Sequence, residues 1–263
     1  MRRAVVLLSG GLDSATALYW ARAQRYQPVA LTVHYGQRHA REISAARDLA
    51  RAAGAEWIEV RFALPWLKTS SLVDRSRRLP DIPASRIGQE EIPSTYVPGR
   101  NTIFLSLAAS LADSIGAQAV VIGSNAQDYS GYPDCRPEYN RAFQKVATLG
   151  TRRGVEGRRL LLLAPLQRLD KAGIVRLACR LNVPLERTWS CYRGGSHPCG
   201  RCDSCKLRAR GFAAGYVFKD IGIAEIAQHA AEHEHDEPAG QRSNAVGDHA
   251  GADRRDLLRH DDA

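Results

Sequence analysis

The sequence lacks any apolar run close to the roughly 18 residues that a membrane-spanning helix needs. The apolar run near the amino terminus is only five residues long and breaks at Gly10-Gly11, so we interpret it as a buried strand and not as an export signal. Internal repeats are also absent. With 44% hydrophobic and 25% charged residues, these absences exclude transmembrane, collagen-like and wholly disordered proteins. We expect a cytoplasmic protein without a membrane partner, whose 263 residues form one large domain or two small ones.

Cysteine is scarce outside one cluster. Of six cysteines, four lie within fifteen residues, and a chain without an export signal meets a reducing compartment that favours metal binding over disulfides. Four thiolates predict a closed tetrahedral zinc site with a structural role, and an iron–sulfur cluster and a redox role are the alternatives. Four basic side chains around the cluster, Arg193, Arg201, Lys206 and Arg208, are expected to offset its negative charge. The predicted ligands are Cys191, Cys199, Cys202 and Cys205.

The two remaining cysteines are interpreted as ordinary buried thiols. Cys179 falls in an apolar helical stretch, which is typical of a packed thiol. Cys135 falls in a polar stretch, where a nucleophile is the alternative, although no base is evident beside it in the sequence.

The net charge of +9 is unevenly distributed. Residues 222–263 hold ten acidic side chains against four arginines, so residues 1–221 carry 33 basic against 18 acidic side chains. A basic body is either a solvated surface or the binding face for an anion such as a nucleotide, a phosphate or a nucleic acid. Large apolar residues are nearly missing after residue 229, so residues 222–263 are expected to form a disordered acidic tail.

Short apolar runs alternate with helical patterns along the chain. Such alternation predicts a Rossmann-like α/β fold, a doubly wound parallel sheet covered by helices on both faces. Residues 63–99 interrupt it with five prolines and no clean period, which indicates a lid, a binding loop or disorder. Strands are expected at residues 3–8, 28–33, 57–60, 119–123 and 160–163, and helices at residues 13–24, 40–53, 101–115 and 171–181.

A phosphate-binding turn follows the first strand, in the segment Ser9-Gly10-Gly11-Leu12-Asp13-Ser14. Its glycines permit a tight turn, its serines add hydroxyl groups, and the next helix offers free N–H groups to an anion. The lysine of a Walker loop is missing, as is the third glycine of a dinucleotide fingerprint. Asp13 suits phosphate chemistry if it meets Mg²⁺, or if it bonds to N–H groups of the turn. The predicted ATP-binding residues are Leu8, Ser9, Gly10, Gly11, Leu12, Asp13, Ser14, Ala15, Thr16, Ala17 and Leu18.

A second polar segment, residues 123–137, follows the fourth strand and therefore opens at the same edge of the sheet. Its carboxylates and tyrosines are groups that read a flat heterocycle, and local Asx turns are the alternative. Asp128, Asp134 and Arg136 are its candidate substrate-binding residues, beside Arg38 and Arg100 from elsewhere in the chain. The candidate catalytic residues are Asp13, Arg100 and Asp128.

Residues 9–14 resemble the signature of the PP-loop ATP pyrophosphatases, which cleave ATP between its α- and β-phosphates and adenylate a substrate. Residues 35–39, 95–106, 128–137 and 188–192 are similar to motifs of the 7-cyano-7-deazaguanine synthase family, in order and at closely similar spacing. The likeness covers roughly residues 3–218 and includes the four clustered cysteines, which correspond to the zinc ligands of the family.

The resemblance implies an ATP-dependent carbon–nitrogen ligase of queuosine biosynthesis. Such an enzyme converts 7-carboxy-7-deazaguanine and ammonia to 7-cyano-7-deazaguanine through an adenylated carboxylate and an amide. Its small-molecule partners are those two substrates and ATP with Mg²⁺, and it holds one structural Zn²⁺ per chain and forms a homodimer. Residues 1–187 would be the nucleotide-binding α/β domain of the PP-loop type, and residues 188–221 would be a zinc-binding helical segment packed on it.

Two other classes compete with this hypothesis. A tRNA-modifying PP-loop enzyme suits the basic body but requires an RNA-binding domain, and the sequence shows no separate one between residues 1 and 221. A zinc-bearing nucleic-acid-binding regulator leaves the phosphate-binding turn without a purpose. We therefore do not expect direct nucleic-acid binding. His39 is a further candidate, as a proton shuttle or as a local partner of Glu42.

Overall fold

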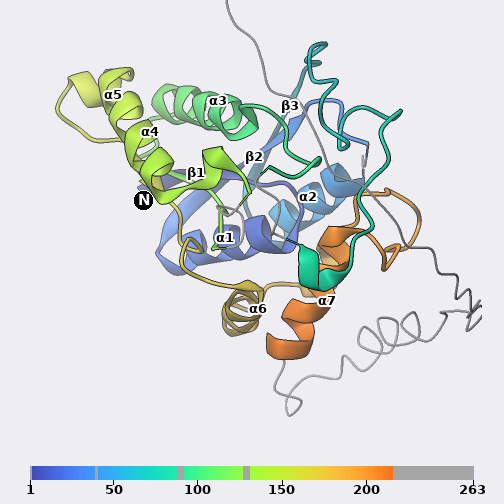
Figure 1. The fold of residues 1–263 in the computed structure, drawn as a ribbon. Helices are drawn as coiled ribbons and strands as arrows, with labels where there is room; N and C mark the ends of the chain where they lie inside the picture. Colours follow the sequence, from blue (N-terminus) through green and yellow to red (C-terminus); the bar gives the residue numbers. More distant parts are fainter. Residues whose placement is uncertain (1, 39–40, 88–91, 127–130, 216–263) are drawn as a thin grey trace, which may run out of the picture.

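The computed structural model describes residues 2–38, 41–87, 92–126 and 131–215, as an α/β fold (Figure 1). Five strands carry the five apolar runs expected from the sequence, with bounds that differ by a few residues. The strands are β1 (Arg2–Leu7), β2 (Tyr26–His34), β3 (Glu56–Arg61), β4 (Ala119–Val121) and β5 (Leu161–Leu163). The longer helices are α1 (Leu12–Ala23), α2 (Arg41–Ala52), α3 (Arg100–Ser114), α4 (Pro137–Leu149), α6 (Lys171–Arg180) and α7 (Asp203–Gly215).

All strand pairs in the sheet are parallel, and the strand order is β3-β2-β1-β4-β5. The chain therefore builds outward from β1 to β3 in one direction, and then from β4 to β5 in the other. The order reverses between β1 and β4, where the turns that follow these strands separate and leave a crevice at the carboxyl edge. This topology confirms the expected doubly wound parallel sheet.

Alternating residues of β1 enter two different cores. Ala4 and Val6 belong to a core shared with α1, α2 and α6, whereas Val5 and Leu7 belong to a core shared with α3 and α4. Figure 1 shows the same division, with α1, α2 and α6 on one side of the sheet and α3 and α4 on the other. Burial on both faces explains why these strands read as continuous apolar runs.

Residues 63–99 form a long, packed connection in the parts that the structure describes. The short 3-10 turn Ala84–Arg86 is the helical element within those parts. Leu67, Leu72 and Val97 are buried in the core that α3 and α4 share with the sheet. The expected long loop therefore packs against one face of the sheet through its buried side chains. Residues 88–91 lie outside the described residues.

Three helices were not individually expected from the sequence: α4, the short α5 (Arg152–Val155) and α7. Helix α4 begins at Pro137 with Glu138 in its first turn, which is a helix-start signal that follows directly on the polar segment. Helix α7 has two glycines on its buried face, Gly211 and Gly215, and packs against α6. Glycine weakens helix propensity, so local sequence underestimates a helix that close packing stabilises.

No helix among the described residues is long and apolar enough to cross a membrane. The predicted acidic tail, residues 222–263, lies outside the described part of the chain.

Candidate active site

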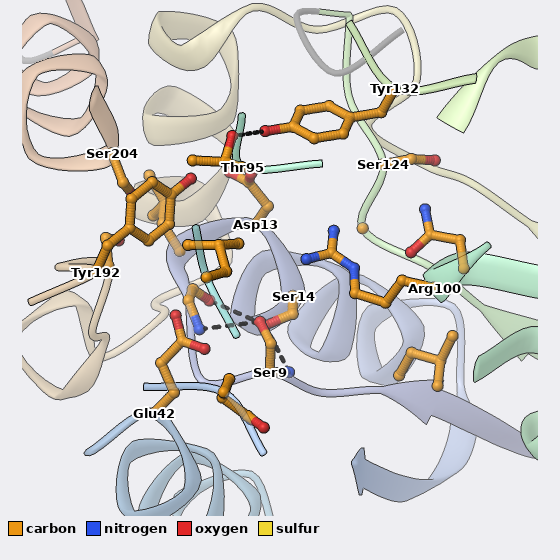
Figure 2. A pocket seen from close by; sticks show the side chains of 18 of the residues that line it. Ser9, Asp13, Ser14, Glu42, Thr95, Arg100, Ser124, Tyr132, Tyr192 and Ser204 are labelled. Atoms are coloured by element: carbon orange, nitrogen blue, oxygen red, sulfur yellow. Dashed lines mark hydrogen bonds between the residues drawn. The ribbon is translucent and has the colours of Figure 1, made fainter. Parts of the chain in front are cut away.

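A cavity of about 430 Å³ opens at the carboxyl edge of the sheet, around the point where the strand order reverses (Figure 2). Its walls come from segments that are far apart in the sequence: the turn after β1, the end of β2, the long connection, the start of α3, the turn after β4, the start of α6 and the cysteine-containing segment. Charged or polar side chains from these walls include Asp13, Glu42, Arg100, Lys171 and Arg208. Such a convergence of polar groups in a concave site is typical of an active site.

The phosphate loop, defined as residues 9–14, lies at the floor of this cavity and is held by its own serines. The Ser9 and Ser14 hydroxyl oxygens lie 3.0 Å apart, and the Ser14 hydroxyl also donates to the Gly11 carbonyl at 3.1 Å. Gly10 has a φ of +90°, and a Cβ at this position would lie 2.3 Å from the Glu42 carbonyl oxygen of α2. A glycine is therefore required at residue 10 both by its backbone angle and by the close approach of α2.

Not all of the predicted ATP-binding residues reach the cavity. Leu8, Ser9, Gly11, Leu12, Asp13 and Ser14 line it. The side chains of Ala15, Ala17 and Leu18 are buried in the core of the α1 face, and the Thr16 hydroxyl donates to the Leu12 carbonyl at 2.8 Å. The second half of the predicted segment therefore packs behind the cavity, and its role in ATP binding stays a prediction.

Asp13 has two partners that sequence reasoning did not identify. Its Oδ2 accepts hydrogen bonds from Lys171 Nζ at 2.5 Å and from Asn125 Nδ2 at 2.9 Å. Asn125 follows β4, and Lys171 opens α6 after β5. The sequence left two roles open for Asp13, contact with Mg²⁺ or bonds to N–H groups of the turn. Among the described residues, its carboxylate accepts hydrogen bonds from side chains at two other strand ends, and the Mg²⁺ role stays a prediction.

Arg100 enters the cavity from the first residue of α3 (Figure 2). Burial alone would lower the pKa of its guanidinium, but the neighbouring Tyr35 phenol, Cys135 and Tyr132 raise that pKa above the ordinary value. None of these three neighbours is a carboxylate. The guanidinium is therefore a sheltered, permanent positive charge whose neighbours leave it suited to an anionic ligand.

Cys135 lies in the wall of the cavity and is buried. Its sulfur lies 3.1 Å from Asn101 Nδ2, next to the start of α3. The structure therefore confirms a buried thiol at this position, packed against the residue that follows Arg100.

The other predicted substrate residues lie elsewhere. The Asp134 carboxylate accepts a hydrogen bond from the Asn101 backbone N–H at 2.9 Å, so it stabilises the start of α3 and does not line the cavity. Arg136 is exposed on the residue before α4. The Arg38 guanidinium donates to the backbone carbonyls of Asp74 and Arg77 in the long connection.

Two candidates fall in segments that are not described. Asp128 lies in residues 127–130 and His39 in residues 39–40, so both lie outside the described residues. Their predicted roles stay predictions.

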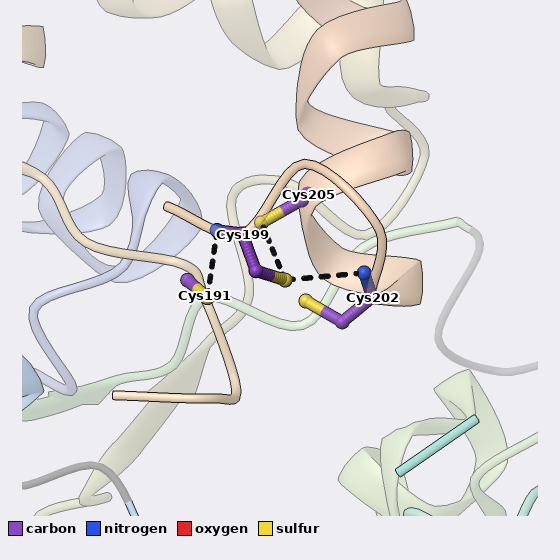
Figure 3. Close-up of side chains that lie close together, drawn as sticks. All are labelled: Cys191, Cys199, Cys202 and Cys205. Carbon is purple, nitrogen blue, oxygen red and sulfur yellow. Dashed lines mark hydrogen bonds between the residues drawn. The ribbon is translucent and has the colours of Figure 1, made fainter. Parts of the chain in front are cut away.

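The four clustered cysteines converge beside the cavity (Figure 3). One ligand atom from each of Cys191, Cys199, Cys202 and Cys205 lies within 4.8 Å of the others, which is a spacing that allows one metal ion to bind all four. The Cys199 N–H points to the Cys191 sulfur at 3.3 Å, and the Cys202 N–H to the Cys199 sulfur at 3.4 Å. Donors of this kind favour thiolates, and the chemistry of the set fits a zinc-type ion.

The basic side chains near the cysteines contact a carboxylate in the long connection. Asp81 lies 2.9 Å from Lys206 Nζ, 3.6 Å from Arg201 Nε and 4.0 Å from Arg193 Nη2. Three of the four cations that were expected to offset the thiolate charge are therefore shared with Asp81. The fourth, Arg208, donates to the Thr188 hydroxyl at 2.7 Å. The ion pairs attach the cysteine-containing segment to the wall that carries Ile82, a cavity-lining residue.

The same segment touches the phosphate loop directly. The Trp189 backbone N–H donates to the Gly10 carbonyl at 2.9 Å, and its indole N–H donates to the Cys191 carbonyl at 3.0 Å. Trp189 and Tyr192 both line the cavity. The residues that flank Cys191 therefore form part of one wall of the cavity.

Comparisons of the sequence with known proteins agree on one family. A family model described as "Queuosine biosynthesis protein QueC" matches residues 3–215. A "7-cyano-7-deazaguanine synthase" of Synechococcus elongatus is 53% identical over 220 residues, covering 82% of this chain and 93% of its own. A relative of the same name from Thermoplasma acidophilum is 51% identical over 215 residues, covering 80% of this chain and 87% of its own.

A solved structure of an NMN synthetase from Francisella tularensis is also similar, at 17% identity and a TM-score of 0.45 over 93% of this chain and 90% of that one.

Proposed function

The chain belongs to the QueC family of queuosine biosynthesis proteins, and on that premise we propose that it is a 7-cyano-7-deazaguanine synthase. The proposed reaction converts 7-carboxy-7-deazaguanine and ammonia to the nitrile at the expense of ATP. The observation that carries the proposal is the cavity at the reversal of strand order, where a loop suited to phosphate faces a sheltered guanidinium. Among the described residues, the groups that raise the pKa of this guanidinium most are Tyr35, Cys135 and Tyr132, and none of them is a carboxylate.

The chemistry requires two activations. A carboxylate is a poor electrophile, so one of its oxygens first attacks the α-phosphorus of ATP, and the electron pair of the breaking P–O bond leaves with pyrophosphate. Ammonia then attacks the carbonyl carbon, AMP leaves, and an amide and a proton are formed. The amide oxygen is adenylated in the same way by a second ATP. Loss of AMP and of both N–H protons then leaves the nitrile.

The phosphate loop suits the charge that both activations develop. Its backbone N–H groups and the first turn of α1 form a fixed environment for a pyrophosphate group. Mg²⁺ bound with ATP would neutralise phosphate charge, and Asp13 is the carboxylate of the loop that faces the cavity. No covalent bond to the protein is needed, so positioning and electrostatic stabilisation account for the catalysis.

Arg100 is the proposed anion site for the substrate or for a phosphate group. Its planar guanidinium can donate two parallel hydrogen bonds to a carboxylate. Asp134, Arg136 and Arg38 are already engaged with backbone groups or exposed, so among the described residues the proposal for substrate binding concentrates on Arg100. Asp128 is kept as a proposed reader of the guanine-like edge.

The cysteine cluster is proposed to bind one structural Zn²⁺. Four thiolates fill a tetrahedral site, so the ion would supply folding energy and no open coordination position. Residues 188–221 are proposed as the zinc-binding segment on the α/β domain of residues 1–187, and the assembly is proposed to be a homodimer.

The proposal is tested by pyrophosphate release. The full chain is incubated with Mg–ATP and ammonia and given 7-carboxy-7-deazaguanine, unmodified tRNA or no acceptor, and pyrophosphate is measured in each case. We expect release that depends on the deazaguanine acid and on ammonia. Release that depends on tRNA alone would assign the chain to a tRNA-modifying enzyme, and no release with any acceptor would remove the catalytic proposal.

A further inference from the structure

The phosphate loop lacks a lysine of its own, yet the fold brings one to it. Lys171 stands 158 residues after Asp13 in the sequence, and its Nζ lies 2.5 Å from the Asp13 carboxylate. Both side chains line the cavity, with exposed fractions of 17% and 23%. The contact is possible because the turns after β1 and β5 open at the same edge of the sheet.

The start of α6 is fixed on two sides. Asp170 precedes Lys171 as the N-cap of α6, and its carboxylate accepts from the Gly173 N–H at 2.7 Å. The carbonyl of Leu169 accepts from the Ala126 N–H at 3.1 Å, which connects this turn to the turn after β4. The backbone of Lys171 is therefore held in place, while its long side chain can change partner.

Helix α7 packs against α6 at Lys171. A Cβ added at Gly211 would lie 2.8 Å from Lys171 Cβ, so the two helices meet closely at this residue. The first turn of α7 carries Cys205, a predicted metal ligand. The cysteine-containing segment therefore reaches the backbone of Lys171 as well as the phosphate loop.

One of the two oxygens of the Asp13 carboxylate makes no hydrogen bond among the described residues. Oδ2 holds Lys171 and Asn125, whereas Oδ1 is buried and has no hydrogen-bond partner among the described residues. A half-used carboxylate at the wall of a phosphate site is a suitable ligand for a divalent cation. A cation that takes this carboxylate reduces its hold on the lysine, because the attraction between Asp13 and Lys171 depends on the same negative charge.

We propose that Lys171 is a catalytic residue. Its side chain is bound to Asp13 beside the phosphate loop and transfers to the phosphates when Mg–ATP binds. The inference rests on the proposed ATP chemistry. As the bond between the α-phosphorus and the bridging oxygen breaks, the electron pair moves to the pyrophosphate, and the protonated amine stabilises that charge. Lys171 exchanges no atom and stays protonated. Arg100 binds an anion throughout, whereas Lys171 acts on the charge that develops.

The test compares K171Q, K171R, D13N, the double variant D13N/K171Q and the control K145Q, all in the full chain. Lys145 is an exposed lysine of α4 and is not part of the site. For each protein, kcat for pyrophosphate release, the Kd for Mg–ATP and the melting temperature are measured. A separate titration measures the Kd for inorganic pyrophosphate with Mg²⁺, which needs no acceptor substrate.

We expect K171Q to lower kcat by about 10²–10³-fold, while the Kd for Mg–ATP changes less than about fivefold. Its melting temperature should fall by roughly 3–6 °C because Asp13 loses its ion pair. The double variant removes both charges, so it should recover the melting temperature but not kcat. K171R should retain part of kcat, and K145Q should match the parent protein.

A double variant that recovers both melting temperature and kcat would overturn the proposal and leave a structural ion pair. K171Q with unchanged kcat would overturn it as well. If the parent protein releases no pyrophosphate with the deazaguanine acid, the proposed function fails, and the pyrophosphate titration still decides the role of Lys171. Binding of pyrophosphate weakened at least tenfold by K171Q, but not by K145Q, supports it, and equal binding overturns it.

Discussion

The phosphate loop and the cysteine segment, defined as residues 189–205, lie against each other but are stabilised in different ways. The loop continues directly from β1, a strand buried between two neighbours, and its serines bond within it. The cysteine segment contains no strand, and its small buried core includes three of the four clustered cysteines. We infer that substitutions in the loop mainly lower kcat, whereas substitutions in the cysteine segment mainly lower the stability and the yield of folded protein.

The contacts between the two regions make this division useful. Trp189 donates to the loop at Gly10. Helix α7 begins inside the cysteine segment and continues beyond it to Gly211, which packs on Lys171. The segment that the proposed zinc would order therefore contacts both the phosphate loop and the backbone of Lys171. Substitutions in the two regions are therefore expected to separate an effect on catalysis from an effect on folding.

Removal of one thiol should have the largest effect. The variant C202S should lose its bound zinc and yield aggregation-prone protein, because structural zinc contributes roughly 10–16 kcal/mol to folding in small zinc domains. Activity should fall in proportion to folded material. C179S is the matched control, since Cys179 lies in α6 outside the cluster. Elemental analysis and the melting temperature give the readout, and iron with visible charge-transfer absorption in anaerobically purified protein would mean a cluster in place of zinc.

Neutralising the loop carboxylate should have the next largest effect, and on a different quantity. D13N should lower kcat by at least about 10²-fold while the protein still melts within a few degrees of the parent. The exposed D48N on α2 serves as the control for loss of one negative charge. Parent-like kinetics in D13N would remove Asp13 from the mechanism.

A change in α7 tests the connection between the regions. In G211A the added methyl group meets Lys171 at the start of α6, so we expect kcat to fall by roughly three- to tenfold, a cost near 1 kcal/mol. The Kd for Mg–ATP should be unchanged. A214G, on the exposed side of the same helix, alters helix propensity without contacting Lys171. An equal loss of kcat in both variants would attribute the effect to helix stability alone.

The smallest effect is expected at Asp81, and it depends on pH. The hydrogen bond from Lys206, with the charges of Lys206, Arg201 and Arg193, lowers the pKa of the Asp81 carboxyl. A lowered folded-state pKa means that the stabilisation is present above the unfolded value of about 3.9 and is lost as the pH falls through the folded value. D81N should therefore lower the melting temperature slightly at pH 7, by about 1–3 °C for a partly exposed group, and by less near pH 3. A difference that does not shrink at acid pH would contradict this assignment.

Features that depend on residues adjacent in the sequence could be predicted from the sequence. Burial on both faces makes each strand an apolar run, and the glycines and serines of the phosphate loop lie side by side in the chain. Lys171 could not be found in this way, because its contact with Asp13 depends on strand order across the whole sheet. Asp134 and Arg38 bond to backbone groups and do not line the cavity, and the sequence does not distinguish polar side chains of this kind from those that face a ligand.

The central claim is that this site activates a carboxylate and then an amide with ATP. The most direct test is the ratio of pyrophosphate to nitrile, measured by ³¹P NMR and mass spectrometry after complete conversion of 7-carboxy-7-deazaguanine with ammonia and excess ATP. We predict two pyrophosphates for each nitrile formed, with the amide as the intermediate. One pyrophosphate for each product, with the amide accumulating as the end product, would contradict it.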